Sequence, residues 1–417
     1  EAGINYYEFK YREADYGPYP KGLMYYLTMM DSWLYDETKP FIHIEAGDTF
    51  DELKKNARNG YFEKLIKEYL LDNNHKSIIS LVPEYGLEKE KEQKEADKLA
   101  EYKSTLTNDE LEELVKKTKE LKEYQDTPSS QEDLEKIPML ELSDIKREPA
   151  KDYNDVKSVD GIKIVHHNIF TNKIAYINMS FDTKCVPDEL IPYMGLLGST
   201  LSLMDTKNYT YPELTNEINI NCGGLATGTA LYSDKVDFSK NTIVYEVKSK
   251  ALYEKVPFVL GMMEEIMYNT RFDDYKRLKE IIARIKSRLE ASLMGQGHSI
   301  AMLECCAQFS ESAYYSDILR GYKYYEFIKK LDEEFEQNKT QIVDKLNKLV
   351  GYIFNKDNVI VSLTADDEGY DCFVKALSAK SCNIKDEHYN TAVRSFIPVN
   401  VKTGYTSASQ VQYVARC

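Results

Sequence analysis

Hydrophobic and polar positions follow two different periods along the chain, which predicts a mixture of strands and helices. Residues 161–170, "GIKIVHHNIF", and 173–183, "KIAYINMSFDT", have the composition of strands and are joined by a turn at "TNK". Further strand patterns occupy 221–233, 241–249 and 357–367. Helical spacing is found in 187–204, 209–220, 273–293 and 334–354. The order of strand pair, helix, strands, long helices and strand predicts an α+β fold, with helices packed on a largely antiparallel sheet.

The first 85 residues carry a second mixture of patterns. Residues 5–16, "NYYEFKYREADY", alternate and predict a strand. Residues 59–73, "NGYFEKLIKEYLLDN", predict an amphipathic helix, and 75–84, "HKSIISLVPE", predict a strand that ends at Pro83.

A highly charged stretch, Glu88 to Gln125, lies between these patterns and the larger mixed region. It is compatible with a partner-binding coiled coil, a solvated spacer or a hinge. Thr107 and Glu110 have the spacing of a capping box, so a new helix is predicted to start there. The interruption is too early for a coiled coil, which needs about three to four continuous heptads. We therefore predict a helical hairpin, whose second helix has one apolar stripe of Leu111, Leu114, Val115, Thr118 and Leu121.

Composition excludes several classes of function. The net charge of −15 argues against nucleic-acid binding, which needs clustered Lys and Arg. No apolar run approaches the about 20 residues that span a bilayer. The seven cysteines are odd in number and form no CxxC motif, so we expect free, mostly buried thiols in a reducing compartment. The adjacent Cys305 and Cys306 fall in a helical pattern and are interpreted as packing residues.

Motifs for chemistry are missing. The histidines show neither HExxH nor HxxEH, and there is no GxSxG or GxxxxGK[ST] motif. His166 and His167 are adjacent in a strand pattern, so their side chains point to opposite faces and cannot bind one ion together. "MGQGHS", 294–299, is interpreted as a loop between helices. "CGGLATG", 222–228, has glycines that permit a close approach either of a neighbouring element or of a bound peptide.

Several distinctive runs resemble the presequence-protease branch of the pitrilysin/insulinase zinc metallopeptidases. They are "EFKYREADYGPYPKGL", "DSWLYD", "IAYINMSFDTKCVPDELIPYMGLLGSTLSLMDTKNYTYPEL", "RFDDYKRLKEIIARIKSRLEASLMGQGHS" and "SQVQYVARC". The resemblance implies four homologous α+β domains in two halves, which a helical hairpin joins around a peptide-degrading chamber. On this basis 1–85 is the end of a second domain, 86–148 the hairpin linker, 149–394 a third, non-catalytic domain, and 395–417 the first strand of a fourth.

The resemblance also defines what this chain is expected to lack. The family's catalytic HxxEH helix corresponds here to Tyr193–Leu201, which has no histidine or glutamate. No catalytic or metal-binding residue is therefore expected, and zinc is expected only in the parent enzyme. By analogy with the catalytic copy, Gly223 and Gly224 line the substrate chamber. The expected partners are the missing catalytic N-terminal half and unstructured peptides, with no nucleic acid and no membrane.

The resulting hypothesis is a non-catalytic portion of an enzyme that encloses and degrades short unstructured peptides. The expected location is the cytoplasm, or an organelle as in some relatives. The alternative is a stand-alone peptide-binding or assembly subunit that pairs with a separate catalytic chain.

Overall fold

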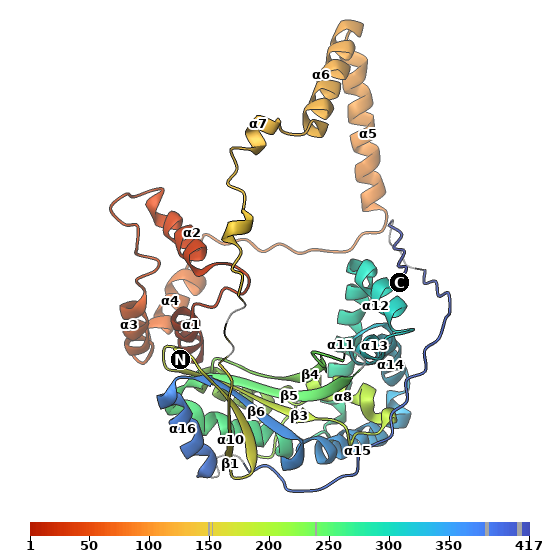
Figure 1. Ribbon diagram of the computed structural model, residues 1–417. Coiled ribbons are helices and arrows are strands. Elements are labelled where there is room, and N and C mark those ends of the chain that lie inside the picture. The colour runs from red at the N-terminus through yellow and green to blue at the C-terminus, as the bar shows by residue number, and fades with distance from the viewer. Residues whose placement is uncertain (149–150, 152, 238–239, 380–382, 407–410) are drawn as a thin grey trace. The chain divides into compact units, whose positions relative to one another are not determined.

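The computed structural model describes residues 1–148, 151, 153–237, 240–379, 383–406 and 411–417 (Figure 1). The chain divides into two compact units, residues 1–61 with 152–417, and residues 62–151.

The larger unit contains a six-stranded sheet in the order β1-β2-β6-β3-β5-β4. Its strands are β1 (Asp155–Val159), β2 (Ile162–Asn168), β3 (Ile174–Asp182), β4 (Leu225–Ser233), β5 (Asn241–Leu252) and β6 (Val359–Ala365). Every neighbouring pair is antiparallel except β2 with β6, which is parallel. The α+β prediction with a largely antiparallel sheet is confirmed.

Beyond residue 187, the structure has a helix in each of the four predicted ranges, and it also has helices that the sequence patterns did not predict. They are α8 (Ile191–Thr200), α9 (Tyr211–Asn221), α10 (Val256–Asn269), α11 (Tyr275–Gly295), α12 (Gly297–Cys306), α13 (Glu311–Arg320), α14 (Tyr322–Glu333), α15 (Phe335–Ile353) and α16 (Asp367–Ser378). Short 3-10 turns precede α8, α10 and β6, at Asp188–Leu190, Tyr253–Lys255 and Lys356–Asn358. The loop predicted at "MGQGHS" is reduced to Gln296, which lies between α11 and α12.

The expectation that β2 and β3 pair with each other was wrong. They are consecutive in the chain, but β6 lies between them and pairs with both. Val361 and Leu363 of β6 are fully buried. Placing β6 in the centre of the sheet buries more of its apolar surface than placing it at an edge would, which favours the central position. Sequence spacing could not reveal this insertion, because it depends on a long-range contact.

The core lies on one face of the sheet. Ile177, Met179 and Phe181 alternate along β3 and are almost completely buried, beneath helices that include α8, α10 and α16 (Figure 1). Each large apolar side chain buried in this way contributes about 1.5–3 kcal/mol. Helix α8 approaches β4 very closely, because a Cβ at Gly198 would lie 3.2 Å from the Cα of Gly228. Packing therefore restricts Gly198, whereas a Cβ added at Gly228 would have no atom within 4 Å.

Residues 5–16 are mostly helical, so the predicted strand was wrong. Helix α1 (Ala2–Glu13) is followed by α2 (Lys21–Trp33) and α3 (Gly47–Ala57). Phe9 of α1 is buried and α1 packs against α9. Tertiary burial of this one face overrides the β propensity of the tyrosines. The backbone of Ala14 is left-handed (φ 46°), and its N–H caps the helix by donating to the carbonyl of Lys10.

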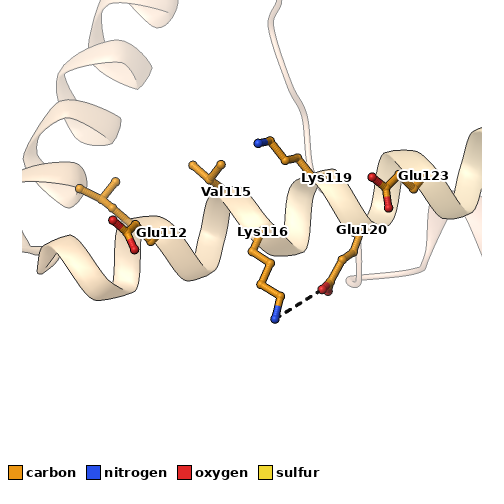
Figure 2. A pocket seen from close by; sticks show the side chains of 7 residues that line it. Glu112, Val115, Lys116, Lys119, Glu120 and Glu123 are labelled. Atoms are coloured by element: carbon orange, nitrogen blue, oxygen red, sulfur yellow. Dashed lines mark ion pairs between the residues drawn. The ribbon is translucent and has the colours of Figure 1, made fainter.

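The smaller unit contains the predicted hairpin. The elements of this region are α4 (Tyr61–Leu65), a π-helical turn (Ile66–Leu71), α5 (Leu87–Thr105), α6 (Asn108–Asp126), α7 (Gln131–Leu134) and a 3-10 turn (Leu142–Asp144). The capping box at Thr107 and Glu110 is confirmed, with both of its hydrogen bonds present. Much of the apolar stripe of α6 is exposed, and Figure 2 shows Val115 of this stripe beside charged neighbours.

The strand predicted at 75–84 was wrong. These residues have no regular secondary structure, and Ile78 and Leu81 are 94% and 95% exposed. A strand needs a neighbouring strand to satisfy its backbone, and the described part of this unit contains none. In the larger unit, residues 395–406 and 411–417 also have no regular structure, so their assignment to a fourth domain stays a prediction.

Candidate functional site

The face of the sheet opposite the core is polar. Because side chains alternate along a strand, Asn178 and Ser180 of β3 share this face with Glu246 and Lys248 of β5. This surface, which we call the polar face, is formed by residues of three neighbouring strands. They are Tyr176, Asn178 and Ser180 of β3, Ala226, Gly228 and Ala230 of β4, and Glu246, Lys248 and Lys250 of β5. It combines both signs of charge with small residues on its outermost strand.

A buried carboxylate organises the centre of the polar face. The side chain of Glu246 is 7% exposed, and one of its oxygens, Oε1, accepts hydrogen bonds from Asn178 Nδ2 at 2.9 Å and Tyr232 OH at 3.0 Å. Lys248 Nζ lies 2.7 Å from the second carboxylate oxygen. Burial alone would raise the pKa of Glu246, but the hydrogen bonds from Lys248, Asn178 and Tyr232 outweigh burial and lower it. The carboxylate is therefore held in its charged form and is paired with Lys248, whose side chain is 50% exposed to solvent.

A second ion pair joins the polar face to α1. Lys250 Nζ donates to both carboxylate oxygens of Glu13, at 2.6 and 2.7 Å, and the Glu13 side chain is only 5% exposed. Burial, and then the nearby charge of Glu13, raises the pKa of Tyr176. Both groups of this ion pair are largely desolvated, so removing either one would leave the other charge without its partner in a poorly hydrated place.

The two glycines of the expected chamber lie in different surroundings. The ring of Phe9 covers Gly223, since a Cβ built there would meet ring carbons at 2.1 to 2.6 Å. Gly224 is open, with no atom within 4 Å of a built Cβ, and its φ of +130° favours glycine. Its carbonyl accepts a hydrogen bond from Ser249 Oγ at 2.8 Å. The structure thus gives Gly223 a packing role and leaves Gly224 uncovered.

Strand β4, which follows these glycines, is an outermost strand of the sheet. Among the described strands it pairs only with β5. An outer strand presents backbone groups on one side that a further extended segment can pair with. On the polar face, Ala226, Gly228 and Ala230 of this strand are small, and Tyr232 follows them.

Metal-binding groups are not found where the family's zinc helix would place them. Helix α8, which includes Tyr193 and Leu197, is largely buried and offers no histidine or carboxylate, so it does not fit a zinc ion. Among the described residues, one group of three donors could hold a metal: Asp357, Asp386 and His388. All three are exposed, and the ion pair of His388 with Asp357 accounts for the proximity of these two. The hydrogen bond between them also raises the pKa of His388.

The adjacent histidines and the cysteines are accounted for by packing or by exposure to solvent. His166 is buried, and its Nε2 lies 3.0 Å from the carbonyl of Ala365, whereas His167 lies on the other face near Ser362. The cysteines are less buried than expected, because only Cys185 and Cys222 of those described are buried. Cys382 lies outside the described residues. None of the helices described is long and apolar enough to cross a membrane.

The polar network of the sheet was missed at the sequence level. A signal existed in "YEVKSK", where charged residues stand at 246, 248 and 250, on one face of a strand. Among 69 acidic residues, however, nothing marked Glu13 or Glu246 as buried.

The sequence of this chain is similar to those of several known proteins. Residues 81–331 match the family model for the domain associated with peptidases of family M-16, subfamily C, and the chain belongs to this family. It is 38% identical over its whole length to Protein HypA of Clostridium perfringens, covering 42% of that protein. It is 29% identical to Presequence protease 1, chloroplastic/mitochondrial, of Arabidopsis thaliana, over 88% of this chain and 34% of that one.

A third relative, the mitochondrial presequence protease of Drosophila melanogaster, is 26% identical over 72% of this chain and 28% of its own length. The chain is therefore homologous to presequence proteases over part of their length, and it spans less than half of each of these relatives. The resemblance to the presequence-protease branch is confirmed.

Proposed function

We propose that this chain is a non-catalytic portion of a zinc metallopeptidase that encloses and degrades short unstructured peptides. It contributes a peptide-facing wall and a connecting hairpin. The observation that carries this proposal is the family match over 81–331, together with the similarity to longer relatives named presequence proteases. The catalytic zinc belongs to another part of the parent protein, because α8 has no ligand for it.

The polar face supplies the chemistry that an unstructured peptide requires. Such a peptide brings unpaired backbone groups and side chains of either charge. The outer edge of β4 offers backbone pairing, and Lys248 and Glu246 offer opposite charges next to it. Small residues on β4 accept peptide side chains of many shapes. Gly224 lies at the start of this edge and lines the chamber directly, while Gly223 supports the wall through Phe9.

The proposed division of the chain keeps the predicted boundaries. Residues 1–85 belong to the second repeat domain, 86–148 to the linker, 149–394 to the third domain and 395–417 to the fourth. The exposed, charged surface of α5 and α6 suits a solvated connector that permits the halves to move. A cytoplasmic location, or an organellar one as in some relatives, is part of the same proposal.

The proposal is tested on the purified intact chain by metal analysis and by incubation with an unstructured peptide. We expect less than stoichiometric zinc, no cleavage, and photo-crosslinking of the peptide to β4. One tightly bound zinc per chain with peptide cleavage would refute the non-catalytic assignment. Copurification of this chain with a separately encoded catalytic chain would instead establish the alternative, a stand-alone subunit.

A further inference from the structure

Three cysteines gather where residues 411–417 meet α12. Cys305 and Cys306 are the last two residues of that helix, and the Sγ of Cys306 lies 3.5 Å from the Sγ of Cys417. Cys417 is exposed, so a small oxidant reaches it from solvent. Cys306 and Cys417 are thus separated by 111 residues in sequence but by one side-chain contact in space.

Residues 399–401 and Tyr413, which precede Cys417 in the sequence, are held on this side of the fold by several contacts. Gln308, just beyond α12, binds Val401 twice: its Nε2 donates to the Val401 carbonyl at 2.8 Å, and its Oε1 accepts from the Val401 N–H at 2.7 Å. The Gln308 carbonyl accepts from the N–H of Val399 at 2.8 Å. The ring of Tyr413 lies directly over Gly297, at the start of α12. These contacts attach residues 399–401 to the end of α12 and Tyr413 to its start. The contact of Cys417 with Cys306 is therefore one of several contacts between this part of the chain and α12.

The geometry needs only a small change to form a covalent bond. A disulfide has a sulfur–sulfur distance of about 2.05 Å, so the two sulfurs must approach by roughly 1.5 Å. Cys417 is exposed and Cys306 partly exposed, so rotation of their side chains is not prevented by a packed core. A hydrogen bond with Cys417, followed by burial, raises the pKa of Cys305, which lowers the thiolate fraction of this neighbour.

We propose that Cys306 and Cys417 form a reversible disulfide, a modification site that fastens the residues around Cys417 onto α12. The oxidant is a peroxide. The Cys417 thiolate attacks one oxygen of hydrogen peroxide, the O–O bond breaks, and the departing hydroxide takes the proton as water. Cys417 is then a sulfenic acid. The Cys306 thiolate attacks its sulfur, the S–O bond breaks, and a second water leaves. Two thiols are oxidised to one disulfide and one peroxide is reduced to two waters.

The disulfide would join residues that are 111 positions apart and would hold the extended residues against Gln308. Under reducing conditions these residues are held by noncovalent contacts alone. Oxidation therefore changes how firmly they are attached, without moving the sheet.

The test is peptide mapping of the intact chain after treatment with dilute hydrogen peroxide, alkylation of the remaining thiols and digestion. We expect a linked pair of peptides that contain Cys306 and Cys417, which dithiothreitol separates. In Cys306→Ser the link should be lost, whereas Cys305→Ser should retain it. Cys372→Ser is the matched control, since Cys372 is also partly exposed but lies in α16, and it should leave the link unchanged.

A second measurement does not require any variant. Amide hydrogen exchange of Val399 and Val401 should slow by about tenfold or more in the oxidised chain, because the disulfide limits opening of this region. Three results would overturn the proposal: Cys417 fully alkylated after oxidation, Cys417 linked mainly to Cys305, or a link formed only between two chains.

Discussion

Replacing Gly223 with alanine tests the packing of α1 on the sheet. The new Cβ would meet ring carbons of Phe9 at 2.1 to 2.6 Å, whereas carbon atoms normally pack about 3.5–4.0 Å apart. The ring must move by more than about 1 Å, and overpacking of this size costs roughly 1–3 kcal/mol. Phe9→Ala alone should cost about 3 kcal/mol, because the removed side chain is buried.

The decisive comparison is the double variant. With Phe9 removed, the alanine at 223 has space, so its added cost should fall close to zero. The two substitutions should therefore be coupled by about 1–3 kcal/mol. Urea denaturation followed by fluorescence measures this coupling, because the single tryptophan, Trp33, lies in α2 of the same N-terminal region.

Gly224→Ala is the matched control. Its cost comes from the backbone, whose φ is +130°, and should be about 1–3 kcal/mol with or without Phe9. If Gly223→Ala were equally destabilising in the wild-type chain and in Phe9→Ala, the contact with Phe9 would not be the reason why a side chain is unfavourable at position 223.

The remaining predictions concern pH, the helix cap and the approach of α8 to β4. The pKa of Glu246 is lowered in the folded chain, so its stabilisation is present above the unfolded pKa of about 4.5 and is lost as the pH falls through the folded pKa. Glu246→Gln should cost about 1–3 kcal/mol at pH 7 and less at pH 3, measured by urea denaturation; an equal cost at both pH values would contradict the assignment. Thr107→Ala should destabilise α6 by about 1 kcal/mol, measured as faster amide hydrogen exchange near the start of the helix. Thr118→Ala, in the exposed middle of α6, should not have this effect. Equal effects of the two substitutions would argue against the cap. Gly198→Val should destabilise the larger unit by more than about 2 kcal/mol, because its side chain would meet the backbone of β4, and an unchanged urea midpoint would refute this.

Much of the fold was predictable because local patterns were strong. The long helix over 273–293 and the cap at Thr107 depend on residues close in sequence, and both were predicted correctly. The errors occurred where distant contacts decide the structure. Residues 5–13 are helical because α1 packs against α9 and Phe9 covers Gly223. Residues 75–84 form no strand because the described part of their unit contains no strand to pair with.

The candidate site was predictable only in part. The glycines at 223 and 224 were recognised as places of close approach, but sequence could not tell that Phe9 covers one of them. The network of Glu246 with Asn178 and Tyr232 comes from three strands that sequence analysis could not align in register. The proximity of Cys306 and Cys417 depends on a separation of 111 residues, which no local pattern encodes.

The central claim, that this chain binds unstructured peptides on its sheet without cleaving them, is tested most directly by site-specific photo-crosslinking. A photoreactive residue at position 226, on the polar face of β4, is compared with one at position 360, on the same face but on β6. We predict that an unstructured peptide is captured intact at 226, and at least about tenfold less at 360, because β4 is an outer strand whereas β6 is paired on both sides. Equal capture at both positions, or recovery of cleaved peptide, would contradict the claim.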